Sequence, residues 1–183
     1  MHVGGGNVLL LEADMGSGKS LVSPVVIQTK LQKPVLVLVP SVDVARKNAQ
    51  LIAKLSGLGW KFGREVGVCA GGQWRDGLHI MVATYGAFVA RSRLRNRDWG
   101  GIVLDESHVE QWQVEVARAD VHDALNDNAD LFVMEASATM NHFKLAAYWQ
   151  QAGDVVNVVH HKIEGKGTPY QRKLIEVPTY GSK

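Results

Sequence analysis

Two polar clusters, each placed directly after an apolar run, contain the residue types of nucleotide chemistry. Residues 16–20 read Gly-Ser-Gly-Lys-Ser and follow the apolar run 7–12. Successive backbone N–H groups in a glycine-rich turn form a concave anion site, and the N-terminal end of a following helix adds positive charge. Lys19 is expected to reach terminal phosphates, and the Ser20 hydroxyl to bind Mg²⁺. The predicted phosphate-binding loop comprises Gly16, Ser17, Gly18, Lys19 and Ser20.

The second cluster, Asp-Glu-Ser-His, follows the apolar run 101–104. Carboxylates at the end of a buried strand are costly unless they bind a cation or transfer a proton. Asp105 is predicted to hold Mg²⁺, and Glu106 to orient and activate the attacking water. His108 is predicted to contact the phosphate side and to relay its state to a neighbouring segment.

A third segment, Ser137-Ala138-Thr139, follows the apolar run 131–135. Small hydroxyl residues at a strand end allow the backbone to approach the acidic cluster and to hydrogen-bond with it. Taken alone, residues 136–139 could also be a plain turn of small residues.

Short β-branched runs alternate with longer segments of helical periodicity, which predicts the elements that position these clusters. The predicted strands are 7–12, 35–39, 66–69, 79–84, 101–105, 131–135 and 155–160, and the predicted helices are 19–31, 42–58, 86–92, 114–126 and 141–151. Strands that are continuously apolar are typical of a sheet covered on both faces. The pattern therefore predicts an α/β fold, a mostly parallel sheet with helices on both faces, with ligands beyond the carboxyl ends of the strands.

Composition limits the class of protein. The chain has 183 residues, 46% hydrophobic and 21% charged, which is ordinary for one globular domain and excludes a disordered chain. One cysteine, Cys69, excludes an intrachain disulfide framework and fits a reducing compartment. No apolar run approaches the roughly 20 residues that span a bilayer, so we expect no transmembrane segment. The net charge of +2 does not by itself indicate nucleic acid.

Taken as a set, these motifs resemble those of superfamily 2 helicases of the DExH type over roughly residues 7–160. Further segments match the same family: the Val-Pro-Ser of 39–41 with Arg46, the glycine pair 71–72, and the Thr-Tyr-Gly of 84–86. Pro24, five residues after the loop lysine, recurs in the DEAH and flavivirus-type members. The resemblance leans toward helicases of positive-strand RNA virus polyproteins, of the flavivirus, potyvirus or hypovirus kind.

The resemblance implies a RecA-like P-loop NTPase domain over residues 1–162 and a linker over 163–183 toward a second RecA-like domain. It implies ATP and Mg²⁺ at the motifs above, with Lys19, Asp105 and Glu106 catalytic, and with Ser137 and Thr139 coupling hydrolysis to nucleic-acid binding. The residues that it assigns to single-stranded nucleic acid, RNA favoured, are Pro40, Ser41, Arg46, Gly72, Thr84 and Gly86. Contacts from hydroxyls and amides to phosphates would make this binding independent of sequence.

Departures from the family pattern sharpen the expectation. Ala13 stands where the strict phosphate loop has glycine, and Met140 follows Thr139 where viral members often have proline. No segment after His161 resembles the family's arginine-bearing motif, which belongs to the second domain. We therefore expect an amino-terminal fragment that binds nucleotide weakly and hydrolyses it poorly. The expected location is cytoplasmic, and the viral resemblance extends this expectation to a replication complex in the host cytoplasm.

Two other classes of protein share parts of this pattern. One is a DNA-dependent translocase ATPase that acts on duplex DNA without separating strands. The other is a catalytically inactive RecA-like module that holds RNA or a protein partner. The intact Lys19, Asp105 and Glu106 argue against a decayed module.

Overall fold

In the computed structural model the described residues are 7–13, 18–109, 111–153, 156–163 and 173–176. They form one nine-stranded sheet in the order β4-β3-β5-β2-β6-β7-β1-β8-β9. The strands are β1 Asn7–Ala13, β2 Val35–Val39, β3 Val66–Ala70, β4 Gln73–Arg75, β5 Ile80–Thr84, β6 Gly101–Asp105, β7 Phe132–Ser137, β8 Asn157–Ile163 and β9 Lys173–Glu176. The pairs that involve the edge strands β4 and β9 are antiparallel, and every other described pair is parallel.

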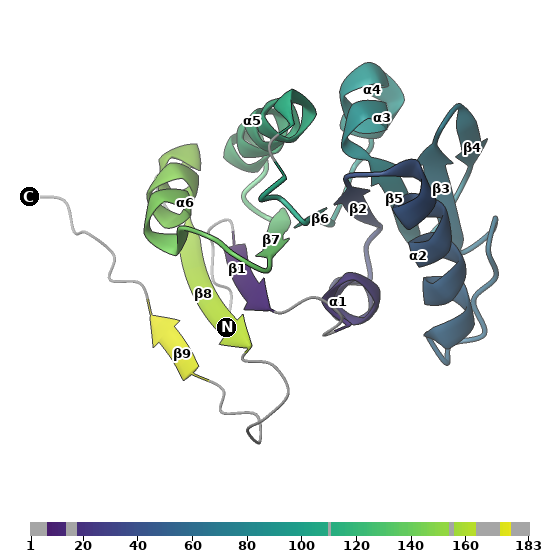
Figure 1. Cartoon of the computed structure of the whole chain (residues 1–183), viewed down its shortest axis with the longest axis horizontal. Coiled ribbons are helices and arrows are strands. Elements are labelled where there is room, and N and C mark those ends of the chain that lie inside the picture. The colour runs from purple at the N-terminus through teal and green to yellow at the C-terminus, as the bar shows by residue number, and fades with distance from the viewer. Residues whose placement is uncertain (1–6, 14–17, 110, 154–155, 164–172, 177–183) are drawn as a thin grey trace, which may run out of the picture.

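Helices cover both faces of this sheet (Figure 1). They are α1 Lys19–Leu31, α2 Val42–Leu55, α3 Tyr85–Ala90, α4 Ser92–Arg95, α5 Trp112–Asp127 and α6 His142–Trp149, with a 3-10 turn at Gln150–Ala152. The chain therefore has the α/β architecture that the strand and helix pattern predicts, and this architecture agrees with the RecA-like fold that the resemblance implies.

Alternation along the central strands divides the core into two layers. In β2, Leu36 and Leu38 pack in the layer beneath α3 to α6, together with Trp149. The intervening Val35, Val37 and Val39 pack in the layer beneath α1 and α2. All five residues of β2 are fully buried, as are those of β3, β5 and β6, because helices cover both sides of these strands.

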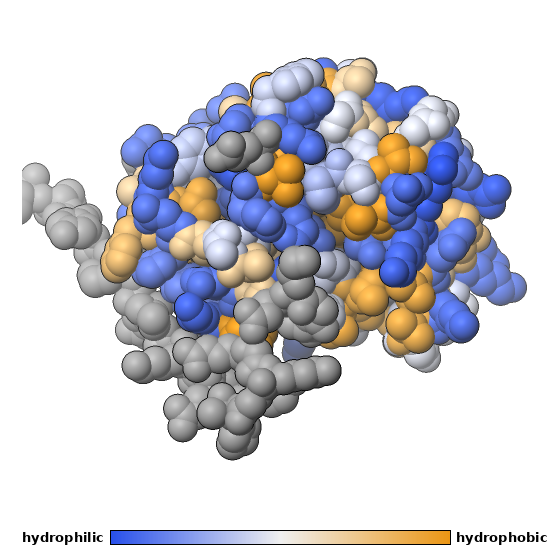
Figure 2. Space-filling view, viewed as in Figure 1, coloured by the Kyte–Doolittle hydropathy of each residue, from blue (hydrophilic) through white to orange (hydrophobic). Residues whose placement is uncertain are grey.

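The face of the molecule seen in Figure 2 is mostly polar, with apolar side chains exposed in several places. One of these places is helix α1. Val22 and Val26 on this helix are more than half exposed. Beside them a groove is lined by apolar side chains of α1, β1 and β7, including Leu9 and Phe132. The side chains of β1 and β7 that face α1 are therefore covered less completely than the side chains that face α3 to α6.

Some predicted boundaries were wrong. The predicted helix 86–92 begins one residue earlier, because the Thr84 hydroxyl accepts a hydrogen bond from the Ala87 N–H, and it breaks at the extended residue Arg91. The predicted helix 42–58 ends at Leu55. The short antiparallel strand β4 was not predicted, since three residues give no usable alternation.

The segment predicted as a linker includes residues of the sheet. The last residue of β8, Ile163, lies one position beyond the predicted domain end, and β9 pairs antiparallel with β8 between residues 173 and 176. The remainder of 163–183 lies outside the described residues, so the assignment of a linker and of the boundary at 162 stays a prediction.

Candidate functional site

The sequence-predicted residues gather at one edge of the sheet, where the parallel strands end. Strands β6, β7 and β1 are neighbours, and the acidic cluster, the Ser-Ala-Thr segment and the phosphate loop follow them. We call this the phosphate half; its members are Lys19, Ser20, Asp105, Glu106, His108, Ser137 and Thr139. Strands β3, β5 and β2 form the other part of the edge, the hydroxyl half; its members are Pro40, Ser41, Arg46, Gly71, Gly72, Thr84 and Gly86.

The phosphate loop leads directly into α1. Gly18 is the N-cap of this helix with φ of +81°, a backbone conformation that glycine adopts without strain. Lys19 is 6% exposed, and its Nζ donates a hydrogen bond of 2.8 Å to the Ala13 carbonyl. The same Nζ lies 3.2 Å from Glu106 Oε1, so the loop lysine and the acidic cluster are in direct contact. Gly16 and Ser17 lie outside the described residues.

Asp105 ends strand β6 and is 1% exposed. Burial raises the pKa of this carboxyl, and a hydrogen bond from the Ser20 hydroxyl and the charge of Lys19 oppose that shift. Its Oδ1 is buried and has no hydrogen-bond partner among the described residues. A buried carboxylate oxygen beside a serine hydroxyl suits a hard divalent cation such as Mg²⁺. The predicted metal pair Ser20 and Asp105 is therefore brought together.

Glu106 has a strained backbone. Its φ is +53°, a left-handed conformation that a residue with a Cβ rarely adopts. This turn directs one carboxylate oxygen to Lys19 and the other to His108, whose Nδ1 lies 3.3 Å from Oε2. Strain of this kind persists where surrounding contacts hold it, and it concentrates at functional sites.

Contacts continue from the acidic cluster to the end of β7. His108 Nδ1 lies 2.9 Å from the Ser137 hydroxyl, which also donates to the Thr139 carbonyl at 2.6 Å. The Thr139 N–H in turn donates to the Ser137 oxygen at 3.2 Å. The two segments predicted to communicate are thus joined by hydrogen bonds.

In the hydroxyl half, both predicted hydroxyl residues are helix N-caps. The Ser41 oxygen accepts a hydrogen bond from the Val44 N–H at the start of α2, and Thr84 caps α3 in the same way. Strands β2 and β5 pair with Val39 opposite Thr84, so the two caps lie at neighbouring strand ends. Their geometry places hydroxyls and helix N-termini, which are anion-binding groups, on one surface.

The remaining predicted nucleic-acid residues surround these caps. Gly71 and Gly72 have φ of +56° and +79°, and a Cβ on Gly71 would lie 2.9 Å from Val42 in α2. Arg46 is exposed on α2, and Pro40 is half-buried after β2. Gly86 is exposed, and a Cβ there would contact nothing within 4 Å, so the structure gives no steric reason for glycine at this position.

Sequence reasoning missed a buried polar network behind the acidic cluster. Arg118 on α5 donates to Glu135 Oε1 at 2.9 Å and to the Ser107 carbonyl at 3.2 Å. The second oxygen of Glu135 accepts from Trp149 Nε1 at 2.8 Å, and Tyr85 donates its hydroxyl to the Asp105 carbonyl at 2.9 Å. The signal in the sequence was an arginine on the apolar side of α5 and a glutamate inside an apolar strand.

This network supports the acidic cluster from inside. Glu135 is fully buried and Arg118 is 9% exposed. Burial lowers the pKa of Arg118, but the carboxylates of Glu135 and Glu115 outweigh it, so the guanidinium is held firmly charged. The Arg118 side chain of this charged pair holds the Ser107 carbonyl in place. Because Ser107 stands between Glu106 and His108 in the sequence, this contact restrains the backbone of the acidic cluster.

Comparison with known families identifies the class of protein. The model of the DEAD/DEAH box helicase family matches residues 2–146, which is most of the chain. The chain belongs to the DEAD/DEAH box helicase family, whose members are ATP-dependent and bind nucleic acid. No curated protein matches the chain. Among the described residues, no helix has the length and apolar character needed to cross a membrane.

Proposed function

We propose that this chain is the first RecA-like domain of an ATP-dependent RNA helicase of the DExH type. The observation that carries the proposal is the continuous set of contacts from Lys19 through Glu106 and His108 to Ser137. In such an arrangement, Lys19, which would contact the terminal phosphate, and Glu106, which would activate water, are linked to the end of strand β7. This linkage supports a domain that converts nucleotide hydrolysis into movement.

The phosphate half would perform hydrolysis with its own residues in distinct roles. Lys19 would leave its contact with Glu106 to bind the terminal phosphates, and Glu106 would then orient water for in-line attack. Asp105 and Ser20 would hold Mg²⁺, which supplies charge neutralisation at the phosphate oxygens when bound. His108 and Ser137 would report the change in Glu106 to Thr139 and the end of β7.

The hydroxyl half would bind the phosphate backbone of a single strand. Ser41, Thr84 and the turn at Gly72 present hydroxyls and backbone amides, with Arg46 beside them, and none of these groups reads a base edge. Such a surface explains how a chain with a net charge of only +2 could bind RNA without sequence preference.

A second RecA-like domain would complete this enzyme. Among the described residues, Glu106 pairs with Lys19 and His108 and with no arginine. In the family that this chain resembles, arginines from the second domain stabilise the transition state, so this chain alone should bind nucleotide weakly and hydrolyse it poorly. Origin in a viral polyprotein and a cytoplasmic location are part of the proposal and rest on the resemblance.

Nucleotide binding tests the proposal directly. The measurement is a fluorescence anisotropy titration of a fluorescent Mg-nucleotide on the chain, on Lys19→Ala and on Lys30→Ala, an exposed lysine of the same helix. Loss of a buried charged contact costs about 2–5 kcal/mol, so binding by Lys19→Ala should fall by at least about 30-fold. Lys30→Ala should bind like the parent chain.

Two results would contradict the proposal. If Lys19→Ala binds the Mg-nucleotide as tightly as Lys30→Ala does, the nucleotide does not use the predicted loop. Binding of single-stranded RNA without any Mg-nucleotide binding would favour an inactive RecA-like module. The choice of RNA is tested with single-stranded RNA, single-stranded DNA and duplex DNA of one sequence, and preference for the duplex would favour a DNA translocase.

A further inference from the structure

Three potential metal ligands from three separate elements meet outside the site described above. They are Glu12 near the end of β1, His160 in β8 and His142, the first residue of α6. Their ligand atoms all lie within 4.8 Å of one another. None of the three takes part in the contacts of the phosphate half or of the hydroxyl half.

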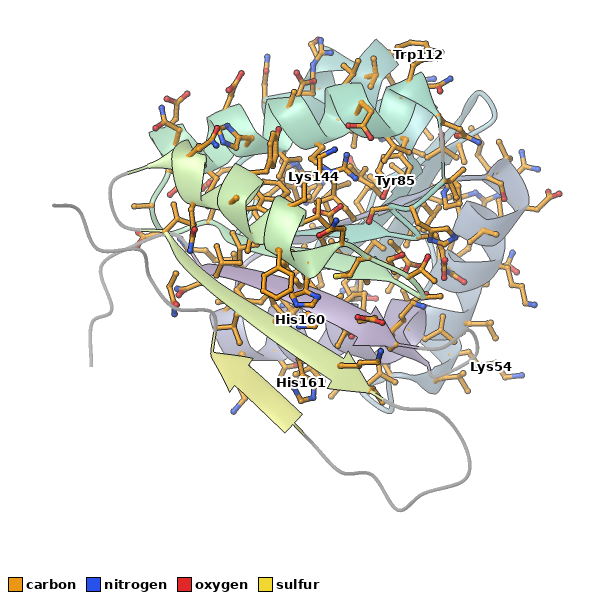
Figure 3. All side chains as sticks on the ribbon, turned by 60° about the vertical axis from the view of Figure 1, so that its left-hand side comes forward. Lys54, Tyr85, Trp112, Lys144, His160 and His161 are labelled. Carbon is orange, nitrogen blue, oxygen red and sulfur yellow. The ribbon has the colours of Figure 1, made fainter. Side chains whose placement is uncertain are left out.

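Strand register explains why these side chains share one face of the sheet. Strands β1 and β8 are parallel, with Leu10 opposite His160 and Glu12 opposite Lys162. Because alternate residues of a strand point to the same side, Glu12 and His160 lie on the side that α6 covers. Figure 3 shows His160 on the side of β8 that faces α6 and His161 on the other side.

His160 is the most unusual member of the cluster. It is 1% exposed, and neither of its ring nitrogens has a hydrogen-bond partner among the described residues. Its Nε2 lies 3.5 Å from Glu12 Oε2, which is too long for a good hydrogen bond. Burial lowers the pKa of this ring and so favours its neutral form, which is the form that ligates metals. An unpartnered buried imidazole next to a carboxylate needs a partner.

The geometry points to a site for a divalent transition metal, Zn²⁺ being the best match, with Glu12, His142 and His160 as ligands. Two imidazoles and one carboxylate are a known set of three protein ligands for Zn²⁺, which leaves a fourth position for water. Imidazole also favours Zn²⁺ over Mg²⁺ and Ca²⁺, which prefer oxygen. This site is separate from the Mg²⁺ proposed at Asp105.

The two carboxylate oxygens of Glu12 have different partners, so one can bind the metal while the other keeps a protein contact. Oε1 is 2.9 Å from Lys162 Nζ, and Oε2 faces His160. Lys162 can therefore keep its contact and orient the carboxylate while Oε2 binds the ion, as outer partners of ligands do elsewhere.

His142 must change its ring orientation to bind. Its ring stacks on His160 with centroids 4.1 Å apart and planes inclined by 4°. An ion bound by both rings must lie near both ring planes, and parallel stacked planes do not meet. His142 is only half-buried at the start of α6, so its side chain has room to turn, whereas the buried His160 does not.

A bound ion would cross-link β1, β8 and α6 immediately before the phosphate loop. The experiment uses the untagged, metal-stripped chain, titrated with Zn²⁺ by calorimetry and with Co²⁺ by visible absorption. We expect one equivalent of metal, Co²⁺ bands of nitrogen and oxygen ligation, and a higher melting temperature with Zn²⁺.

Matched variants distinguish this site from adventitious binding by histidine. Glu12→Gln and His142→Ala should each weaken binding at least about tenfold, and both positions are accessible enough to leave the fold intact. His160→Ala should abolish binding, and His161→Ala, its neighbour on the opposite side of β8, should have no effect. The proposal is overturned if the chain binds no Zn²⁺, if binding persists in both Glu12→Gln and His142→Ala, or if His161→Ala weakens it equally.

Discussion

Under the proposed function, the two halves of the functional edge would both hold phosphate groups, and they differ in the side chains that would do so. The phosphate half contains basic and acidic side chains that contact one another, Lys19 with Glu106 and Glu106 with His108. The hydroxyl half uses neutral caps, Ser41 and Thr84, at the beginnings of two helices. Acidic and basic side chains therefore predominate in one half, and hydroxyl groups at helix N-termini, with the exposed Arg46 beside them, in the other.

The difference extends into the core behind each half. Behind the hydroxyl half, β2, β3 and β5 are buried along their lengths, and mostly apolar side chains pack against them. Behind the phosphate half, the Arg118–Glu135 pair penetrates the core and holds the Ser107 carbonyl. If the proposed function holds, the half that would change its charge contacts during hydrolysis rests on a buried charged network, whereas the half that would bind a phosphate backbone rests on buried strands.

The largest effect is expected from breaking that charged support. Arg118→Ala leaves Glu135 buried without its cation, which costs about 3–5 kcal/mol of unfolding free energy. Arg95→Ala is the matched control, because its pair with Asp120 is partly exposed and worth at most about 1 kcal/mol. Urea denaturation measures both. Equal stability of the two variants would show that the phosphate half does not depend on its buried pair.

A charge placed in the hydroxyl half should separate the two functions. Ser41→Asp keeps the N-cap of α2 but places a negative charge where a phosphate is proposed to bind, and Ser41→Asn keeps the cap without charge. We expect single-stranded RNA binding to weaken roughly tenfold, about 1.4 kcal/mol, in Ser41→Asp alone. Nucleotide binding should be unchanged in both variants. Unchanged RNA binding in Ser41→Asp would remove this cap from the proposed surface.

Asp105→Asn should stabilise the protein while it destroys Mg²⁺-dependent nucleotide binding. Burial raises the pKa of Asp105 above its unfolded value, so its contribution to stability is fully present below that unfolded value and is lost as pH rises through the folded pKa. At pH 7 the variant should therefore melt at a higher temperature than the parent chain.

The difference in melting temperature between Asp105→Asn and the parent chain should shrink as pH falls below the folded pKa of Asp105. At such pH the carboxyl of the parent chain is protonated, so burying it costs no more than burying the neutral amide. Asp98→Asn, at an exposed position, should show no such change. Thermal melting across pH 4 to 8 measures both variants. A lower melting temperature of Asp105→Asn than of the parent chain at pH 7 would contradict the prediction.

The smallest effect on stability is expected at the contact between the acidic cluster and β7. Ser137→Ala removes the hydrogen bonds to His108 and Thr139 and should cost about 0.5–1 kcal/mol. Nucleotide affinity should be unchanged, because Ser137 contacts neither Lys19 nor Asp105 directly. In the chain joined to its second domain, stimulation of hydrolysis by RNA should fall. Normal stimulation would show that this contact does not transmit the signal.

The sequence was sufficient for the fold class and for the placement of most of the phosphate half, whereas the roles of these residues stay a prediction. Continuous apolar runs predict strands buried on both sides, and a glycine-rich loop or an acidic cluster directly after such a run predicts its place at the sheet edge. These signals are local, so Lys19, Asp105 and Glu106 could be recognised without knowing the strand order. The roles of the hydroxyl half came from resemblance, because a serine or threonine before a helix is as typical of a cap as of a binding site.

Only the tertiary structure decided which distant residues face one another. Arg118 and Glu135 are 17 positions apart, and Glu12, His142 and His160 come from opposite ends of the domain. Periodicity indicates which face of a strand a residue occupies, but not which strand lies beside it. The order β7-β1-β8 and its register bring these groups together, since they place residues on a shared face that no local pattern relates.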